Sequence, residues 1–444
     1  MTKRKLDEIY SCICPNCSGL KVNALGDVDI DLEKEIEKLA HDFYYGHQTK
    51  RTALKVANKV AATISGAVAQ GYGKDVFSVD WNSADRKQIE HLQQNVYQFS
   101  FAKTHEQLKA TTAALHSDGK IVPFTEFREV TQRINNDYTN RYLPIEYNTA
   151  IASAQMGSRW IQYQEEKDDL PFLTYRTVGD GRVRSSHEKL DGVTRAVDDF
   201  IWDTIFTPNG WNCRCDIEQS TDEKVTPVSK IIIPTDIPPM FKTNLAKSGL
   251  VFPADHPYFD KLPEAVIKTA DNNNPFLYEK TYAGKKGGYV YQNSLTPTGK
   301  DFKDIFSISK TLANAGDKIV MLPEIAPNNE WKEALRNVVL PDGVKQGKNS
   351  DAIVNGNQVV QFKTSSSNTQ ASIKGLIKAG SKQSDVICIK LTEKVAAKDL
   401  QRALKGQVKQ SKSVSEVWII DVKDKITKYN RSEIADFFKK RKQK

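Results

Sequence analysis

Residues 175–215 read YRTVGDGRVRSSHEKLDGVTRAVDDFIWDTIFTPNGWNCRC and hold the densest group of reactive side chains in the chain. The PNG triplet at 208–210 has the composition of a turn, and we expect this turn to direct Trp211 into a core. Cys213 and Cys215 are two residues apart, so an extended backbone places both thiols on one side. The segment therefore predicts a small, β-rich, cysteine-bearing end to a domain.

The spacing of an imidazole and two thiols in this segment supports more than one interpretation. His187, Cys213 and Cys215 could hold a zinc ion, because imidazole and thiolate are its usual ligands. They supply three ligands, whereas a closed structural zinc site needs four. Alternatively, the three side chains form a hydrogen-bonded knot that stabilises the fold without a metal. Catalysis by His187, Asp191 and Cys213 is a third interpretation, for which the sequence indicates no substrate pocket.

Three further cysteines lie near the start of the chain, in the segment CICPNC. Its Cys-Pro-Asn-Cys part has the form of a zinc-knuckle turn. Cys12, Cys14 and Cys17, with Cys213 or Cys215, could make a four-thiolate structural zinc site. Disulfide bonds are the alternative. The charged opening MTKRKLDEIYSC contains no apolar run, so we expect no signal peptide and reduced thiols. No window is apolar enough for a membrane span, and we expect no membrane partner.

The charge of the chain is unevenly distributed. The 444 residues carry a net charge of +9, with 39% apolar and 27% charged residues, enough for two or three ordinary domains. Residues 331–444 contain 24 Lys and Arg against 11 Asp and Glu, an excess of 13 positive charges. The earlier residues are therefore slightly acidic. A basic domain of this kind usually meets phosphate groups.

Residues 31–166 show the apolar spacing of helices. An apolar stripe runs from Phe124 to Tyr142 and continues after Pro144, so we expect two packed helices broken at the proline. The alanine-rich run Ala53–Gly71 predicts another helix, whose small residues allow a close neighbour. This first part should therefore be mainly α-helical.

Composition changes after the cysteine-bearing segment. Eight of the seventeen prolines lie between Pro227 and Pro275, which predicts a partly ordered connector laid over the first domain. Beyond Tyr289, predicted helices alternate with predicted strands, beginning with a helix that ends at Gly316. We therefore expect three parts: a mainly α domain with a β-rich end (1–225), a connector (226–288) and an α/β domain with a mixed sheet (289–444).

Four motifs in the first part resemble one family, the phage Mu F-like minor head proteins. They are VGDGRVR, ending at Arg184; the HEKLDG box, His187–Gly192; the DD pair before Phe200; and PNGWNCRC, from Pro208. Segments from Asn95 and Tyr142 extend the resemblance to roughly residues 30–220. It implies a phage or prophage head-morphogenesis protein that assembles with portal and capsid proteins, travels in the virion and is made in the bacterial host cytoplasm.

The last part resembles a different group, the PD-(D/E)xK nucleases, and more narrowly the nuclease domains of contact-dependent inhibition toxins. LANAGDKIVMLPE, SDAIVNGNQVVQFK and KQSDVICIKL carry this resemblance. It implies a restriction-endonuclease-like fold, a tRNA or DNA substrate and an immunity protein as partner. Asp351, Gln361 and Asp304 would hold a divalent ion, Mg²⁺ or Mn²⁺ or else Zn²⁺, and Lys363 would assist the attacking water.

This part departs from the nuclease pattern at two points. Gln361 stands where an acid is usual, so an amide oxygen would replace a carboxylate at the metal. Asp304 is the nearest match to the glutamate of the preceding helix. Glu324 and Gln383 are weaker candidates for the site. Alternatively, the chain is a purely structural virion protein whose last domain is an inactive, nuclease-like module that binds nucleic acid.

The geometry of one hairpin distinguishes these interpretations in part. A two-residue turn at Asn355-Gly356 would pair Asp351 with Val360 and direct it away from Gln361. A three-residue loop at 355–357 would instead pair residue 351 with residue 361, so that both side chains and Lys363 share one face. The nuclease interpretation therefore predicts the three-residue loop.

Overall fold

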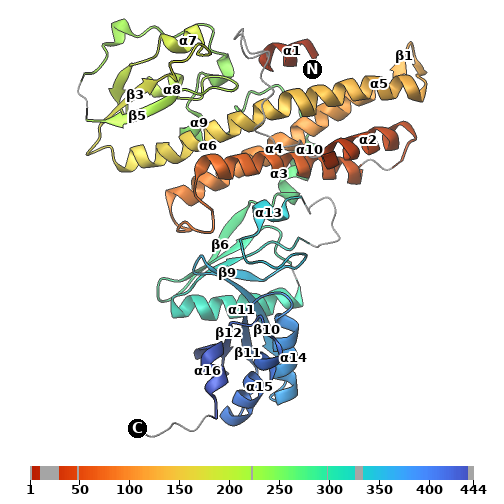
Figure 1. The fold of residues 1–444 in the computed structure, drawn as a ribbon, viewed down its shortest axis with the longest axis vertical. Helices are drawn as coiled ribbons and strands as arrows, with labels where there is room; N and C mark the ends of the chain where they lie inside the picture. Colours follow the sequence, from red (N-terminus) through yellow and green to blue (C-terminus); the bar gives the residue numbers. More distant parts are fainter. Residues whose placement is uncertain are drawn as a thin grey trace. The chain divides into compact units, whose positions relative to one another are not determined.

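The computed structural model describes residues 3–10, 30–47, 50–221, 224–297, 299–325 and 334–438 (Figure 1). The chain divides into two compact units, Met1–Asn272 and Asn273–Lys444, hereafter unit 1 and unit 2. Within the described ranges, no helix is long and apolar enough to span a bilayer.

Unit 1 is mainly helical, as predicted. Its long helices are α1 (Lys3–Tyr10), α2 (Ile30–Tyr44), α3 (Lys50–Tyr72), α4 (Ala84–Ala113), α5 (Phe124–Asn135) and α6 (Leu143–Glu165). The small residues of α3 allow close packing against α6. A Cβ atom added to Gly71 would lie 2.2 Å from the carbonyl oxygen of Ile151, so only glycine fits there.

The predicted break at Pro144 does not occur. A π-helical segment, Asn136–Tyr142, joins α5 to α6, and the chain stays helical from Phe124 to Glu165 (Figure 1). Pro144 lies in the first turn of α6. A π segment loosens the helical hydrogen-bond pattern, and a first-turn proline removes few hydrogen bonds, so the helix accommodates the proline.

A small sheet forms the β-rich end of unit 1. Strands β3 (Phe172–Arg176), β4 (Thr194–Ala196) and β5 (Asp216–Ser220) are antiparallel, in the order β4-β3-β5. Two short helices, α7 (Ser185–Glu188) and α8 (Trp202–Ile205), lie in the intervening segments. A separate hairpin of β1 (His116–Ser117) and β2 (Lys120–Ile121) follows α4.

The proline-rich segment belongs largely to unit 1. Phe241, Phe252 and Tyr258 are fully buried in the same core as the long helices. Short helices punctuate it: η3 (Val228–Lys230), η4 (Pro239–Phe241), α9 (Leu245–Ser248) and α10 (Glu264–Asn273). The units therefore divide after Asn272, not at the expected boundaries of 225 and 289, because these aromatic side chains need the helical core and because a strand before residue 289 pairs with unit 2.

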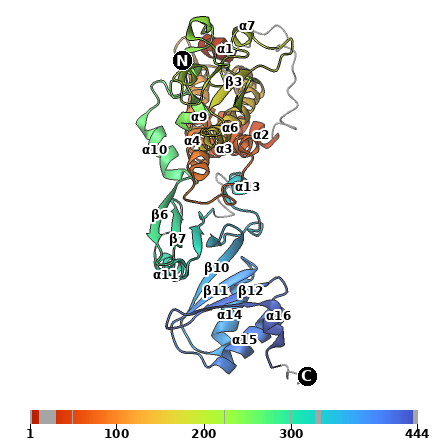
Figure 2. The ribbon, with the colours of Figure 1, turned by 90° about the vertical axis from the view of Figure 1, so that its left-hand side faces the viewer.

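The described residues of unit 2 form an eight-stranded mixed sheet with helices, which confirms the predicted α/β class (Figure 2). Its strands are β6 (Tyr278–Ala283), β7 (Tyr289–Asn293), β8 (Lys318–Met321), β9 (Ala352–Val354), β10 (Gln358–Ser365), β11 (Val386–Leu391), β12 (Glu416–Ile420) and β13 (Ile426–Asn430). They are hydrogen-bonded in sequence order, and β7–β8, β10–β11 and β11–β12 are parallel pairs.

Helices cover both faces of this sheet. They are α11 (Lys300–Ala315), α13 (Arg336–Val339), α14 (Gln370–Gly380), α15 (Ala397–Gln410) and α16 (Arg431–Asp436). As predicted, α11 ends at Gly316, which has φ +108°. Val360 and Phe362 share a core with α11, whereas Ile387 and Ile389 share a core with α14 and α15. The two cores follow the alternation of side chains along each strand.

A buried ion pair ties the helices of unit 1 together. Lys103 on α4 donates to the Oε2 atom of Glu146 on α6 over 2.6 Å, and neither side chain is more than 2% exposed. Tyr10 of α1 donates to the Oε1 atom of the same carboxylate over 2.7 Å. Because burial disfavours the charged ammonium, the pKa of Lys103 is lowered. The buried carboxylate of Glu146 therefore needs the charge of Lys103 and the hydrogen bond from Tyr10 for its stabilisation.

We expect Lys103→Met to destabilise unit 1 by about 3–5 kcal/mol, since it leaves a buried carboxylate without its cation. Urea unfolding of the full chain, followed by helical circular dichroism, measures the change. Lys87→Met is the matched control on the same helix, because Lys87 is an exposed lysine of α4. The control should change stability by about 0.5 kcal/mol or less. Equal effects of the two substitutions would contradict the importance of the buried pair.

Candidate functional site

The imidazole and thiols predicted to lie together do so. The Nδ1 atom of His187, on α7, lies 3.4 Å from the sulfur of Cys215 and 3.7 Å from that of Cys213. The three ligand atoms are all within 4.8 Å of one another. Zinc bonds of about 2.0–2.3 Å in a tetrahedron place neighbouring ligands roughly 3.3–3.8 Å apart. The spacing therefore fits a zinc ion as well as a hydrogen-bonded knot.

Polar contacts of the neighbouring motifs fix this cluster. The PNG turn directs Trp211 inward, as predicted, and its indole is 5% exposed. Arg184 donates to the carbonyl oxygen of Trp211 over 2.7 Å, and Tyr175 donates to the side chain of the fully buried Asn209 over 2.9 Å. Arg214, between the two cysteines, forms two hydrogen bonds of 2.7 Å with Asp180. The VGDGRVR, HEKLDG and PNGWNCRC motifs thus meet around the thiols.

The electrostatics of the cluster favour a thiolate. A hydrogen bond from Cys215 lowers the pKa of Cys213 well below its usual range, and His187 acts in the same direction, against the effect of burial. A thiolate is the form of cysteine that binds metals. The predicted partner cysteines, Cys12, Cys14 and Cys17, lie outside the described residues. Within the described part, three ligands are therefore assembled around one thiolate.

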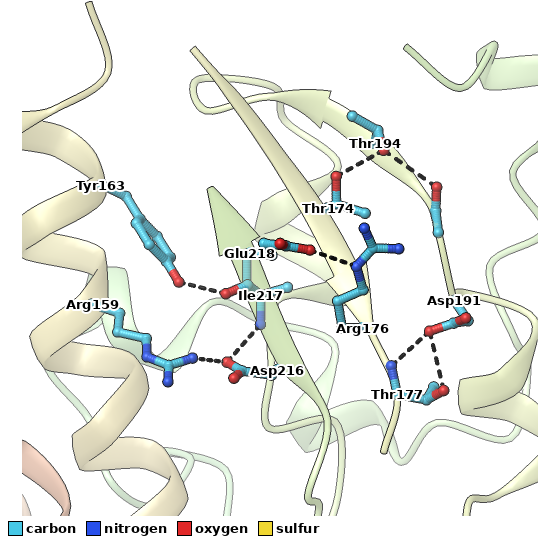
Figure 3. A network of polar contacts seen from close by, with 11 residues as sticks. Arg159, Tyr163, Thr174, Arg176, Thr177, Asp191, Thr194, Asp216, Ile217 and Glu218 are labelled. Atoms are coloured by element: carbon cyan, nitrogen blue, oxygen red, sulfur yellow. Dashed lines mark hydrogen bonds and ion pairs between the residues drawn. The ribbon is translucent and has the colours of Figure 1, made fainter. Parts of the chain in front are cut away.

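The HEKLDG box also has a structural role. Asp191 accepts hydrogen bonds from the backbone nitrogen and hydroxyl of Thr177, at 2.7 and 3.1 Å, which closes the segment between β3 and β4 (Figure 3). Thr174 and Thr194 bond across these two strands at 2.8 Å. Asp191 thus shapes the loop that follows β3. This structural role accounts for the aspartate without catalysis.

An open depression of about 480 Å³ lies between α6 and β5. Arg159 pairs with Asp216 at its wall, Arg176 pairs with Glu218 over 2.7 Å, and Tyr163 donates to the backbone of β5 (Figure 3). Each cation of this wall has an acidic partner. The depression is therefore close to neutral, and its polar contacts attach the sheet to the helix.

In unit 2, the hairpin between β9 and β10 has the predicted three-residue loop. Val354 pairs with Gln358 and Ala352 with Val360, so the loop comprises residues 355–357 and residue 351 lies opposite residue 361. Asn355 and Gly356 adopt positive φ angles of 53° and 78°, which Asn and Gly tolerate best. The loop thus brings Asp351 and Gln361 together.

The Asp351 carboxylate receives two hydrogen bonds on one oxygen. Gln361 donates through Nε2, and the backbone nitrogen of Phe362 donates over 2.7 Å. Burial raises the pKa of Asp351 to about 6, although these donors and the charge of Lys363 oppose the shift. Gln361 is 2% exposed, and its Oε1 atom has no hydrogen-bond partner among the described residues. The hairpin therefore holds a carboxylate and, on the neighbouring amide, an unsatisfied oxygen, and both are ligand types that suit a hard cation.

Two exposed acids, Asp301 and Asp304, lie near the start of α11, the helix from which the sequence predicts an acid. Asp301, in the first turn of α11, is the acid of that helix whose charge raises the pKa of Asp351. Asp304 lies one turn later and is exposed. Sequence reasoning missed Asp301, although both acids are visible in the segment DFKD. Glu324 is exposed after β8, and Gln383 donates to the carbonyl oxygen of Asn349 over 3.4 Å.

The comparisons with known proteins concern unit 1. Residues 58–218 match one family, described as Phage Mu protein F like protein. This range runs from α3 to β5 and includes His187, Cys213 and Cys215. The predicted resemblance is therefore confirmed over these residues. No comparison supports a nuclease in unit 2, where the assignment stays a prediction.

Two curated proteins are similar to a shorter part. The Mu-like prophage FluMu F protein of Haemophilus influenzae is 38% identical over 73 residues, 16% of this chain and 18% of that protein. The protein named "Putative capsid assembly protein F" of Escherichia phage Mu is 39% identical over 75 residues, 17% of each chain. The chain thus matches less than a fifth of these relatives' length. No solved structure matches the chain.

If the thiol cluster holds zinc, Cys213→Ser and His187→Ala should each lower the zinc content of the purified full chain by about one ion, since each removes one of few ligands. Elemental mass spectrometry measures the content, and the difference from wild type cancels any zinc bound elsewhere. Cys388→Ser is the control, because that thiol is fully buried in the core of unit 2. Unchanged zinc in all variants would assign the cluster to the hydrogen-bonded knot.

Proposed function

We propose that this chain, whose residues 58–218 match the Phage Mu protein F like family, is a phage or prophage head-morphogenesis protein. The observation that carries the proposal is the position of the match, which covers the helices α3 to α6 and the thiol cluster. One similar protein is named as a capsid assembly protein. We infer that unit 1 binds portal and capsid proteins as the head forms.

The architecture of unit 1 suits a protein that is assembled into a particle. Its interior is fixed by a buried ion pair, a long helix without a break and the thiol cluster. Such a unit keeps its shape when neighbours bind, so little ordering energy is lost on association. Zinc at the cluster would add rigidity at the β-rich end. The chain would then reside in the host cytoplasm and later in the virion.

The assembly proposal predicts that deleting the chain from its phage or prophage lowers the yield of DNA-filled heads at least tenfold. The wild-type chain should restore the yield, because unit 1 supplies the binding surfaces that assembly needs. His187→Ala/Cys213→Ser should restore little, and Cys388→Ser should restore it fully as the matched thiol control. Particles are counted after gradient purification, and mass spectrometry tests whether both units are present in them. Normal heads without the chain would exclude the proposal.

A second candidate function concerns unit 2. We propose a metal-dependent nuclease site at the β9–β10 hairpin, with nucleic acid (tRNA or DNA) as substrate. The observation that favours it is the pairing of Asp351 with Gln361, whose second oxygen is buried without a partner among the described residues. A divalent cation such as Mg²⁺ or Mn²⁺ would bind these oxygens and polarise a phosphate. Asp351 and Gln361 would hold the ion.

Lys363 completes this site as the charged group. It lies two residues beyond Gln361 on β10, so both side chains emerge on one face of the sheet. Its charge opposes the rise that burial causes in the pKa of Asp351. In the reaction, the ammonium would stabilise the charge that develops on the phosphate. If this site is a toxin, the host that makes the chain would need an immunity protein. The competing function is an inactive module that only binds nucleic acid.

Cleavage by the full chain should need a divalent ion, and Lys363→Ala or Asp351→Asn should reduce it about a hundredfold or more. The substrates are tRNA, duplex DNA and single-stranded DNA, each with Mg²⁺, Mn²⁺, Zn²⁺ or a chelator. Protons compete with the metal for Asp351, whose pKa is about 6, so cleavage should fall about tenfold per pH unit below that value.

Lys394→Ala is the matched control for this experiment, since Lys394 is an exposed lysine in the loop before α15. It should leave cleavage unchanged. Survival of every substrate in every metal, while the chain still binds nucleic acid, would remove the nuclease and favour the inactive binding module. Cleavage that persists in a chelator would remove the metal mechanism.

A further inference from the structure

A row of basic side chains follows α15 in unit 2. The row comprises Lys398, Arg402, Lys405 and Lys409, with Lys412 just beyond the end of the helix. Their spacing of four, three, four and three residues places them along one stripe of the helix surface. The opposite side of α15 is apolar, with Ala403, Leu404 and Val408 buried against the sheet. The stripe therefore faces away from the core.

The neighbouring helix α14 extends this basic surface. Lys374 and Lys378 are four residues apart on α14, and Lys382 follows its end. A Cβ atom added to Gly406 of α15 would lie 3.2 Å from the Cε atom of Lys374 and 3.4 Å from its Nζ atom. The absence of a side chain at Gly406 thus lets an ammonium of α14 lie directly over α15. The two helices pack together on one face of the sheet (Figure 2). Their basic side chains therefore form a single basic face.

Most of these cations have no acidic partner. Among the described residues, no ion pair or hydrogen bond involves the side chains of Lys374, Lys378, Lys382, Lys398, Lys409 or Lys412. The nearby acid Asp399 lies 3.6 Å from Arg402 and also accepts a hydrogen bond from Gln370. In unit 1, by contrast, lysines such as Lys55 and Lys74 pair with carboxylates. The positive charge of this face is therefore largely uncompensated.

The chemistry of the face distinguishes its partner. Helices that lie on an anionic membrane combine lysines with exposed apolar side chains that enter the lipid. Among the described residues of α14, α15 and their connection, 370–412, no large apolar side chain is exposed. Lysines act as flexible point charges that suit phosphate and carry no base preference. Repeated, unpaired ammonium groups on a rigid helix pair thus suit a repeated phosphate.

We propose that the α14–α15 face binds the phosphate backbone of nucleic acid without reading its bases. Gln361 and Lys363 of β10 pair with Ile387 and Ile389 of β11, which pack against these helices. The basic face and the hairpin side chains therefore lie on the same side of the sheet. Binding here would hold a strand beside the hairpin. The proposal identifies a binding surface for unit 2 and does not require that the hairpin cleave.

Charge reversal of three exposed lysines tests the proposal in the full chain. Lys378→Glu, Lys398→Glu and Lys409→Glu, combined, should weaken binding to duplex DNA and to tRNA at least tenfold. The slope of log K against log salt for duplex DNA should become shallower by up to about 2.7, or about 0.9 for each phosphate that is no longer neutralised. Fluorescence anisotropy in a chelator, at several salt concentrations, measures both quantities while cleavage is suppressed.

A control with the same change of net charge combines Lys285→Glu, Lys286→Glu and Lys423→Glu, which are exposed lysines in the two strand connections outside this face. The affinity of this control for duplex DNA and tRNA should stay within about twofold of wild type. Lys→Arg at positions 378, 398 and 409 should also retain binding, since the charge is kept. Melting temperatures of all variants check that each remains folded.

Three results would overturn the proposal. The first is that the wild-type chain does not bind nucleic acid. The second is that the two triple reversals weaken binding equally. The third is that the face binds phosphatidylserine vesicles in preference to DNA and tRNA. Failure of the hairpin to cleave would not bear on it, because the binding measurements exclude metal. The triple reversal leaves Asp351, Gln361 and Lys363 unchanged. Loss of binding in this variant would therefore show that binding by the basic face is separate from cleavage at the hairpin.

Discussion

The carboxylate of Glu146 is the interaction on which unit 1 depends. Lys103 of α4, Tyr10 of α1 and Tyr258 of the proline-rich segment all direct polar hydrogens at it. His256 extends the network. Its Nδ1 atom accepts the backbone N–H of Tyr258, so the proton resides on Nε2, which lies 3.2 Å from the Tyr10 hydroxyl. One buried charge thereby joins four segments that are far apart in the chain.

This network also explains why the proline-rich segment is part of unit 1. The ring of Tyr10 stacks on that of Tyr142, with 4.5 Å between the ring centroids. Its centroid lies 4.8 Å from that of Trp211, the residue that the PNG turn directs inward. Phe252 stacks on Phe99 of α4 at 3.8 Å. The first helix, the cysteine-bearing segment and residues 241–258 therefore share one aromatic core. A substitution at any of them would be felt at the thiol cluster, because packed cores transmit strain.

The parts of the fold that local patterns determine could be predicted from the sequence. The helix α11 and its end at Gly316, the strands β8 to β12 and the loop at 355–357 follow from apolar period, glycine and loop length. In unit 2, three strands, β6, β7 and β13, were missed. The first two lie among prolines, asparagines and glycines that resemble a connector, and β13 is only partly buried. The Lys103–Glu146 pair joins residues that no local pattern relates.

The candidate sites show the same division. Residues two apart on one strand, such as Gln361 and Lys363, share a face whatever the fold, so sequence alone places them together. The choice between Asp301 and Asp304 depends on how α11 is rotated over the sheet, which is set by its packing and not by its own sequence. The meeting of His187 with Cys213 and Cys215 needs the whole β-rich end. It was found because the motifs around it resemble a known family.

The carboxylates of Glu146 and Asp351 illustrate how a structural polar group differs from a ligand site. Glu146 has a lysine at 2.6 Å and a phenol at 2.7 Å, so its charge is compensated within the fold. Asp351 has hydrogen-bond donors but, among the described residues, no ion pair, and burial raises its pKa to about 6. Beside it, the buried Oε1 atom of Gln361 has no donor within the described part of the chain. A bound cation would satisfy both oxygens at once, and that shared deficit is the physical reason to seek a metal at this hairpin.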